Sequence, residues 1–286
     1  MTFAASAMLL AGIAGAAEEP YRPHVGQPGK DVIWVPTPER AVERMMALAR
    51  VGPDDFVIDL GSGDGRIVIA AGRQGARGFG VDLDADMVRL AQERARQAGV
   101  AERVKFHVRD IFKTDLKPAS VVTLYLLPEL NAKLRPELLK LTPGTRIVAN
   151  AFDMGEWEAD EVDTSTPSLL RLWVVPAVVA GSWHWTVRLK GKMHEVMLEV
   201  NQQFQRASGV ATIEARRLRM RNATLHGDRL SFVLLDQLGP NYGVRMDYTG
   251  RVKGDRIEGE VVSSESSKPV KWLAVRRPDR VTQTAR

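Results

Sequence analysis

The apolar residues of the first 180 positions gather in short runs, and longer segments with helical character separate these runs. The runs lie at residues 56–60, 78–82, 104–108, 120–127 and 146–152. The predicted helices cover residues 39–49, 87–98 and 132–141, and a further helix starts near residue 67. The fourth run is apolar almost throughout, as expected of a parallel strand that is buried on both faces. Strands that alternate with helices in this way predict a doubly wound α/β sheet.

A different pattern begins near residue 181, where helical periodicity disappears and short strands follow one another. The predicted strands are residues 183–189, 194–204, 209–214, 216–225, 230–236, 244–252, 256–262 and 271–275. Many of the turns between them carry Gly-Lys, Gly-Asp or Lys-Gly-Asp, which are hairpin signals. Eight strands in meander order predict a small antiparallel barrel or a strongly curved sheet.

The N-terminal segment 1–17 has the character of a signal peptide. Residues 3–16 carry no charge, and Ala14-Gly15-Ala16 fits a cleavage site with small residues. We therefore expect an exported, periplasmic or membrane-tethered protein; the alternative is a cytoplasmic protein with an Ala-rich N-terminal helix. The predicted organisation is a leader at 1–17, an extended lead-in at 18–34, an α/β domain at 35–180, an antiparallel β domain at 181–278 and a tail at 279–286.

A turn with glycine at every second position follows the first predicted strand. The strand ends at Asp59, and Gly61, Gly63 and Gly65 follow it. Glycines at this spacing allow a sharp turn and leave room for a ligand against the backbone, beside the free N–H groups of a helix start. Dinucleotide-binding folds place the third glycine where Arg66 stands here. This spacing, without a recognisable hydride-transfer site, argues against a nicotinamide-dependent oxidoreductase.

Acidic residues also end the second and third predicted strands. Asp82 follows the last glycine of the turn by 17 positions, close to the offset at which an acid binds ribose hydroxyls. The next residue, Leu83, offers an apolar edge to an adenine ring. Asp110 follows the third strand, at the sheet edge where α/β folds bind ligands. Asp84 and Asp86 are expected to cap the following helix.

Four motifs in this region resemble those of class I S-adenosylmethionine-dependent methyltransferases. They are Asp59-Leu60-Gly61-Ser62-Gly63-Asp64-Gly65-Arg66, Gly80-Val81-Asp82, Arg109-Asp110-Ile111-Phe112 and Leu124-Tyr125-Leu126-Leu127-Pro128-Glu129. The fuller wording, DLGSGDGRIVIAA followed by LYLLPELNAKLRPELL and a Pro-Gly-Thr turn, is similar to a bacterial branch related to the small seven-β-strand protein-lysine methyltransferases of mitochondria. The resemblance covers residues 35–176 and implies a Rossmann-like fold with S-adenosyl-L-methionine as cofactor.

The resemblance also implies roles for the residues that match these motifs. Asp59 and the three glycines of the turn would hold the methionine moiety of the cofactor, Asp82 the ribose and Asp110 the adenine amino group. Thr37 lies in Val35-Pro36-Thr37-Pro38, ahead of the first helix. It would approach the cofactor carboxylate; the alternative is that Thr37 caps this helix, with Pro38 in the first turn.

The catalytic end departs from the family pattern. Amine methyltransferases of this fold carry an Asn/Asp-Pro-Pro-Tyr-like motif where this chain has Tyr125-Leu126-Leu127-Pro128. Methyl transfer requires a neutral amine held in line with the methyl group, so Tyr125, Glu129 and Asn131 are candidates to orient or deprotonate it. The alternatives are packing for Tyr125 and helix capping for the other two. Asp153 is a weaker candidate of the same kind.

Composition narrows the remaining choices. The chain has no cysteine, which excludes disulfides and thiolate chemistry, and its five histidines show no ligand spacing, so we predict no metal site. Residues 181–286 hold 19 Lys and Arg against 11 Asp and Glu, so the net charge of +5 comes from the β domain. The densest cluster, residues 216–221, predicts a solvated strand face, or alternatively a patch for an acidic partner or lipid headgroups. It has no interleaved aromatic residues, so nucleic acid is not expected there.

Together these features predict a methyltransferase that acts on an amine acceptor, with protein lysine as the expected acceptor. The alternative is a cell-envelope binding protein that keeps the methyltransferase-like fold without turnover. In either case the basic β domain is the part expected to contact the cell envelope or lipid.

Overall fold

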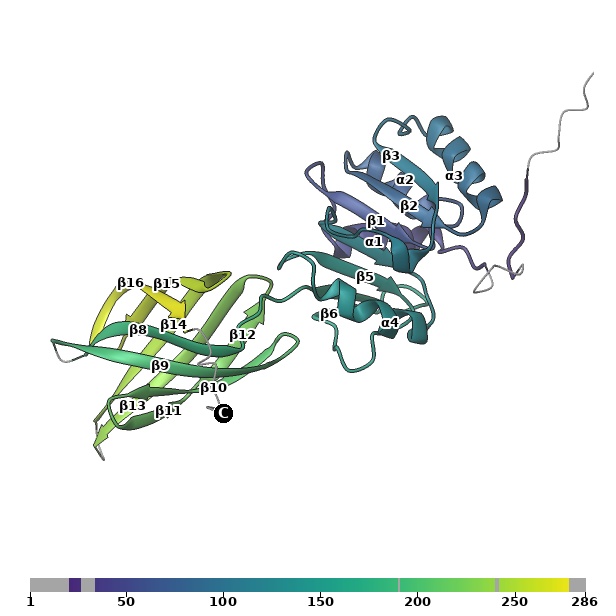
Figure 1. Cartoon of the computed structure of the whole chain (residues 1–286). Helices are drawn as coiled ribbons and strands as arrows, with labels where there is room; N and C mark the ends of the chain where they lie inside the picture. The colour runs from purple at the N-terminus through teal and green to yellow at the C-terminus, as the bar shows by residue number, and fades with distance from the viewer. Residues whose placement is uncertain (1–20, 27–33, 190, 240–241, 278–286) are drawn as a thin grey trace, which may run out of the picture.

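The computed structural model describes residues 21–26, 34–189, 191–239 and 242–277. The chain forms two bodies that follow one another along the sequence, an α/β domain and an antiparallel β domain (Figure 1). The segment predicted as a leader, residues 1–17, and the predicted tail, residues 279–286, lie outside the described residues.

The α/β domain contains a seven-stranded sheet in the order β3-β2-β1-β4-β5-β7-β6. Its strands are β1 (Phe56–Leu60), β2 (Arg77–Asp82), β3 (Val104–Val108), β4 (Val121–Leu124), β5 (Arg146–Asn150), β6 (Glu161–Asp163) and β7 (Leu170–Val174). The first five are parallel, and β7 pairs antiparallel with both β5 and β6. The predicted Rossmann-like doubly wound sheet is confirmed.

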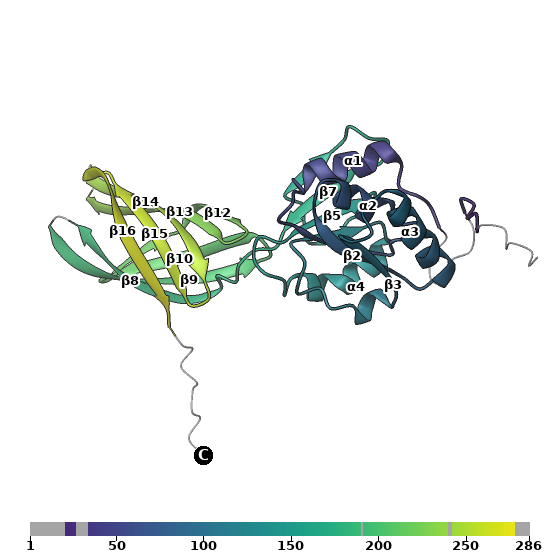
Figure 2. The same ribbon diagram turned by 90° about the horizontal axis from the view of Figure 1, so that it is seen from above.

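Helices cover both sides of this sheet. They are α1 (Glu39–Leu48), α2 (Arg66–Arg73), α3 (Ala85–Gln97) and α4 (Pro128–Leu138), with a 3-10 turn η1 (Ile111–Lys113) after β3. One cluster of buried apolar residues joins α1 and α2 to β1, β5 and β7, and a second joins α4 to the other face of β1, β4 and β5. Figure 2 shows α1 and α4 on opposite sides of the sheet. Alternate residues of the buried strands therefore enter different cores, which explains their continuous apolar runs.

The structure corrects the prediction around the fourth strand. We expected a strand to residue 127 and a helix from residue 132, but β4 ends at Leu124 and α4 begins at Pro128. Proline is suited to the first turn of a helix because its φ is already helical and its missing N–H has no partner there. The apolar residues 125–127 therefore belong to a loop at the carboxyl end of the sheet.

The β domain is a nine-stranded antiparallel sheet in the order β11-β10-β9-β8-β16-β15-β14-β13-β12. Its strands are β8 (Gly181–Leu189), β9 (Lys192–Gln203), β10 (Arg206–Ile213), β11 (Arg216–Arg219), β12 (Arg221–His226), β13 (Arg229–Gly239), β14 (Tyr242–Lys253), β15 (Arg256–Ser263) and β16 (Ser266–Arg276). The strand predicted at 216–225 splits at Met220 into the two edge strands, β11 and β12. Contacts of β10 with β12 and of β11 with β13 bring these edges together, so the sheet is a nearly closed barrel.

Aromatic rings fill the barrel interior. The rings of Trp185, Phe232, Tyr248 and Trp272 lie with centroids 4.8–6.4 Å apart. The predicted solvated strand face is present in the basic cluster at residues 216–221, although Arg216 is not part of it, because Arg216 donates from Nε to the buried Asp236 at 3.0 Å. Arg217 and Arg219 are exposed on the outer face. None of the helices in the described part of the chain combines the length and the hydrophobicity that a membrane span requires.

Candidate active site

The glycine turn lies at the point where the order of the parallel strands reverses, between β1 and β4. Ligands of open α/β sheets bind at this position, outside the carboxyl ends of the strands. Gly61, Gly63 and Gly65 have φ values of 79°, 49° and 80°, a conformation that favours glycine. A Cβ on Gly65 would also lie 2.7 Å from the Cζ atom of Phe106. The turn therefore needs glycine both for its conformation and for its packing.

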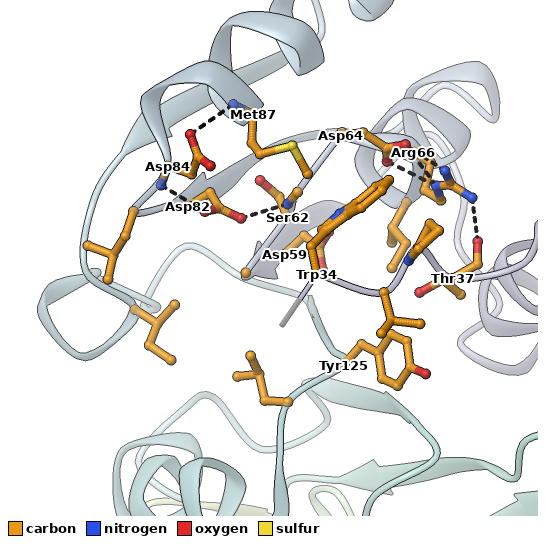
Figure 3. A pocket seen from close by; sticks show the side chains of 18 of the residues that line it. Trp34, Thr37, Asp59, Ser62, Asp64, Arg66, Asp82, Asp84, Met87 and Tyr125 are labelled. Carbon is orange, nitrogen blue, oxygen red and sulfur yellow. Dashed lines mark hydrogen bonds and ion pairs between the residues drawn. The ribbon is translucent and has the colours of Figure 1, made fainter. Parts of the chain in front are cut away.

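Asp82 fixes the shape of this turn. One of its carboxylate oxygens accepts a hydrogen bond from the Gly63 N–H at 2.8 Å, and the other accepts from the Asp84 N–H at 2.9 Å (Figure 3). Burial raises the pKa of Asp82, although these two N–H groups oppose the increase. As predicted, Asp84 caps the next helix, accepting from the N–H groups of Asp86 and Met87 at 2.8 and 3.3 Å.

Asp59 is the most perturbed acid of the site. Its side chain is almost fully buried at the end of β1, where it accepts a hydrogen bond from the Thr123 hydroxyl at 2.7 Å. Burial raises the pKa of Asp59 to about 7, and the charges of Asp82 and Asp64 add to the increase, whereas the Thr123 hydrogen bond opposes it. A buried carboxylate with this pKa favours binding of a cationic group beside it.

Asp64 has a different environment, although it lies in the same turn. Burial would raise its pKa, but the hydrogen bonds and charge of Arg66, with the charge of Arg94, hold the pKa of Asp64 below its ordinary value. Arg66 also donates from Nη1 to the backbone oxygen of Thr37 at 2.8 Å. This chain of contacts ties the segment before α1 to the glycine turn.

A cavity of about 270 Å³ opens in front of the turn. The predicted residues that line it are Thr37, Asp59, Gly61, Gly63, Asp82, Leu83 and Tyr125. Gly65 lies behind it as the N-cap of α2, with no contact to the cavity. Asp110 caps η1 by accepting from the Phe112 N–H at 2.8 Å, and its neighbour Ile111 lines the cavity.

The structure separates the two interpretations of Thr37. The N-cap position of α1 belongs to Pro38, and the first turn of this helix has no side-chain cap. The capping alternative for Thr37 is therefore wrong, because the helix starts one residue later than that alternative requires. Thr37 is buried and lines the cavity beside the glycine turn (Figure 3).

The three predicted catalytic residues do not lie together. Tyr125 lines the cavity, and its ring stacks on Phe152 with centroids 6.2 Å apart. Glu129 is exposed in the first turn of α4, away from the cavity lining. Asn131 is fully buried and donates from Nδ2 to the backbone oxygen of Asp153 at 3.0 Å, so it supports the loop after β5. The side chain of Asp153 is exposed and accepts from the Gly155 N–H at 3.0 Å.

Several lining residues were missed by the sequence analysis. The Nε1 atom of Trp34 lies 2.7 Å from the point where a Cβ of Gly63 would stand, so the indole covers the glycine turn (Figure 3). Phe152 enters the cavity from the loop after β5. Trp34 could have been found from the sequence, because it directly precedes Val35-Pro36-Thr37-Pro38, the segment expected to approach the cofactor. Phe152 gave no local signal, because its role depends on the stack with Tyr125.

Comparisons with known proteins agree with this geometry. The family described as ANTKMT methyltransferase domain matches residues 59–161. A protein-lysine N-methyltransferase of Saccharolobus islandicus is 39% identical over 145 residues, which cover 50% of this chain and 86% of that protein. A crystal structure of an RNA methyltransferase from Salinibacter ruber, in complex with S-adenosyl-L-homocysteine, has 48% identity and a TM-score of 0.50. It covers 51% of this chain and 96% of that one.

The chain belongs to the class I S-adenosylmethionine-dependent methyltransferases. Another relative, the adenine nucleotide translocase lysine N-methyltransferase of Mus musculus, is 36% identical over 129 residues. These residues cover 44% of this chain and 56% of the mouse protein, so the chain spans little more than half the length of this relative.

The residues of this methyltransferase fit its cofactor, S-adenosyl-L-methionine. The glycines leave bare backbone where a Cβ would intrude, and Asp59 and Asp82 lie at the ends of neighbouring strands, as an amino acid and a ribose require. The buried hydroxyl of Ser62 also lines the cavity and has no hydrogen-bond partner among the described residues, so it suits a polar ligand. In the part of the chain that the structure describes, no group of three or more His, Asp or Glu side chains is arranged to hold a metal ion.

Proposed function

We propose that this methyltransferase transfers the methyl group of S-adenosyl-L-methionine to the ε-amine of a protein lysine. Relatives that share the α/β domain are lysine N-methyltransferases, and one of them is matched over 86% of its length. The observation that carries the proposal is the aromatic pair Tyr125 and Phe152 at one end of a cavity whose other wall is acidic. Aromatic faces attract the cationic side chain of lysine.

For methyl transfer, the main task of the protein is to position the acceptor amine against the methyl group. The cofactor supplies a methyl group on a positively charged sulfonium, and the acceptor nitrogen must present its lone pair in line with that group. Tyr125 is the residue that we assign to orient the amine, because it lines the same cavity as the glycine turn and stacks on Phe152. Glu129 and Asn131 are not assigned to the reaction, since one is exposed and the other holds the Asp153 backbone.

RNA is a second candidate acceptor, because the Salinibacter ruber relative is described as an RNA methyltransferase. RNA binding depends on cations that neutralise the phosphate backbone. Among the described lining residues, Arg66 is the one cation, and it is paired with Asp64 at 2.6 Å. The described lining therefore offers no unpaired cation to a phosphate, which favours lysine over RNA as the acceptor.

A binding protein without turnover was the alternative from the sequence. The comparisons argue against it, because the matching family and the relatives that share the α/β domain are methyltransferases. Contact of the basic β domain with lipid or the cell envelope stays a prediction. Export through residues 1–17 also stays a prediction, since these residues lie outside the described part of the chain.

The proposal is tested by supplying methyl-labelled cofactor to the purified protein and a lysate from a strain that lacks the gene. The lysate is then separated into protein, RNA and lipid. We expect the label in the protein fraction, with transfer lost in Asp82→Ala and reduced in Tyr125→Phe. Label in RNA would support the second candidate and contradict lysine as the acceptor. Asp86→Ala is the matched control, because Asp86 is a partly exposed residue of α3 outside the cavity lining.

A further inference from the structure

The turn between β9 and β10 reaches out of the β domain and packs against the α/β domain. Its first residue, Phe204, stacks on Trp157 with ring centroids 5.9 Å apart and an interplanar angle of 17°. The guanidinium of Arg135, from α4, lies 5.5 Å from the centroid of the Phe204 ring. Gln205 donates from Nε2 to the backbone oxygen of Glu158 at 2.8 Å, and Arg206 forms an ion pair with the Glu158 carboxylate. The two domains are therefore joined by specific contacts as well as by the chain.

Phe204 occupies a backbone conformation that is unfavourable for its residue type. Its φ is +54°, and Phe204 and Gln205 form a two-residue hairpin turn between β9 and β10. Such turns favour Gly or Asn, and a bulky residue with positive φ is uncommon. The turn is also braced, because Gln202 accepts from the N–H groups of Val179 and Ala180 and donates to the Phe204 oxygen at 2.8 Å. A strained phenylalanine at a braced turn indicates that the ring itself has a role.

The segment held by this turn leads directly to the acceptor end of the active site. Trp157 is fully buried, and five positions before it Phe152 lines the cavity and stacks on Tyr125. The other side of the segment is held by α4, since Asn131 and Arg135 donate to the backbone oxygens of residues 153 and 154 at 3.0 and 2.7 Å. The loop that carries Phe152 is thus fixed between α4 and the β9–β10 turn.

We propose that Phe204 is a positioning residue for the acceptor end of the active site. Through its stack on Trp157, the β domain holds the loop 152–158 and so keeps Phe152 against Tyr125. The assignment of this end of the cavity to the acceptor rests on the proposed function, whereas the hold on the loop does not. The β domain then supports the acceptor site indirectly, through the loop that carries Phe152, although none of its described residues lines the cavity.

The test compares two variants of the full chain that make the same backbone change. Phe204→Gly removes the ring and gives the turn the residue type that it favours. Glu214→Gly is the matched control, because Glu214 has a φ of +55° in the two-residue turn at the other end of β10. Phe204→Tyr keeps the ring and should behave as the wild type.

Three quantities are measured on each variant: affinity for S-adenosyl-L-homocysteine, amide hydrogen exchange with that ligand bound, and steady-state methyl transfer. We expect Phe204→Gly to keep the affinity, to increase exchange in peptides covering residues 151–158, and to lower kcat/KM for the acceptor about 10- to 100-fold. The KM for the cofactor should not change. Glu214→Gly should match the wild type in all three quantities.

Unchanged exchange at residues 151–158 in Phe204→Gly would overturn the proposal, whatever the acceptor is. Increased exchange with unchanged kcat/KM would also overturn it, because the loop would then be free without consequence for transfer. Failure of the wild-type protein to methylate any protein would instead contradict the proposed function. In that case the exchange result still decides whether the turn holds the loop.

Discussion

Asp59 and Asp82 both lie at the carboxyl ends of parallel strands, but their environments differ. Asp82 accepts two backbone N–H groups and shapes the glycine turn, whereas Asp59 is buried beside a single hydroxyl with its pKa raised to about 7. The sequence predicted both acids, because a strand followed by an acid and a turn is a local pattern. It did not predict the contacts of Trp34 or Phe152, since these depend on segments that meet only in the folded chain.

The raised pKa of Asp59 predicts how cofactor affinity depends on pH. In the role that we assign to Asp59, its ionised carboxylate would bind the ammonium group of the methionine moiety, so binding below pH 7 would first require removal of the proton from Asp59. We expect affinity for S-adenosyl-L-homocysteine to rise about tenfold per pH unit up to about pH 7 and then to level off. Calorimetry across this range measures it, and Asp59→Asn should flatten the profile. A wild-type profile as flat as that of the variant would contradict the assigned role.

The raised pKa of Asp59 also makes the free energy of unfolding of the ligand-free protein depend on pH, with the opposite sign. The folded carboxyl keeps its proton up to about pH 7, whereas the unfolded one ionises near 3.8. The folded state therefore binds more protons in this window, and the contribution of Asp59 to the free energy of unfolding falls as pH rises through it. Urea titrations without ligand should show this decrease to be smaller in Asp59→Asn. An equal decrease in both proteins would argue that Asp59 is already ionised.

The glycines at every second position form the turn that joins β1 to α2, so these three elements make one strand-turn-helix unit. The strand-turn-helix pattern predicted this unit well, because each part has its own sequence signal. The end of β4 and the start of α4 were misplaced, since an apolar loop around a cavity has the same composition as a buried strand. The break at Met220 in the strand predicted at 216–225 also had no local signal, because inward and outward residues alternate as in a strand on both sides of it. The break separates β11 from β12, the two edge strands that meet where the barrel closes.

Gly65→Ala tests the packing of this turn. A Cβ at Gly65 would meet Phe106 at 2.7 Å and Ala91 at 2.8 Å, in addition to the strain of a φ of +80°. We expect a loss of about 2–4 kcal/mol in the free energy of unfolding. Gly99→Ala is the control, because Gly99 has a φ of +69° and open space around its Cβ position. Urea unfolding that shows equal losses for the two variants would contradict the packing argument.

Across the whole molecule, two cores are joined by a small set of contacts. The α/β core and the barrel core form separate apolar clusters, and Phe204 is a barrel residue that packs against the first. The sequence predicted the two domains and their classes from the change in periodicity near residue 181. It could not predict their junction, because a phenylalanine in a hairpin turn carries no signal of what it will contact.

Separate cores predict two thermal transitions. Added S-adenosyl-L-homocysteine should raise the transition of the α/β domain. Arg216→Ala should lower the other, because it leaves Asp236 buried without its ion pair, at a cost of about 3 kcal/mol to the barrel. Calorimetric scans of the full chain distinguish these effects. A single transition that both changes shift together would show that the domains unfold as one unit.

The proposed function is the transfer of a methyl group from a cofactor in this pocket to a lysine. Mass spectrometry of the protein fraction, after incubation with isotopically labelled S-adenosyl-L-methionine, tests that claim most directly. We predict labelled methyl groups on lysine Nε atoms when the wild-type chain is added, and none when Asp82→Ala replaces it. Labelled methyl groups on RNA with unlabelled lysines, or equal lysine labelling by both proteins, would contradict the account.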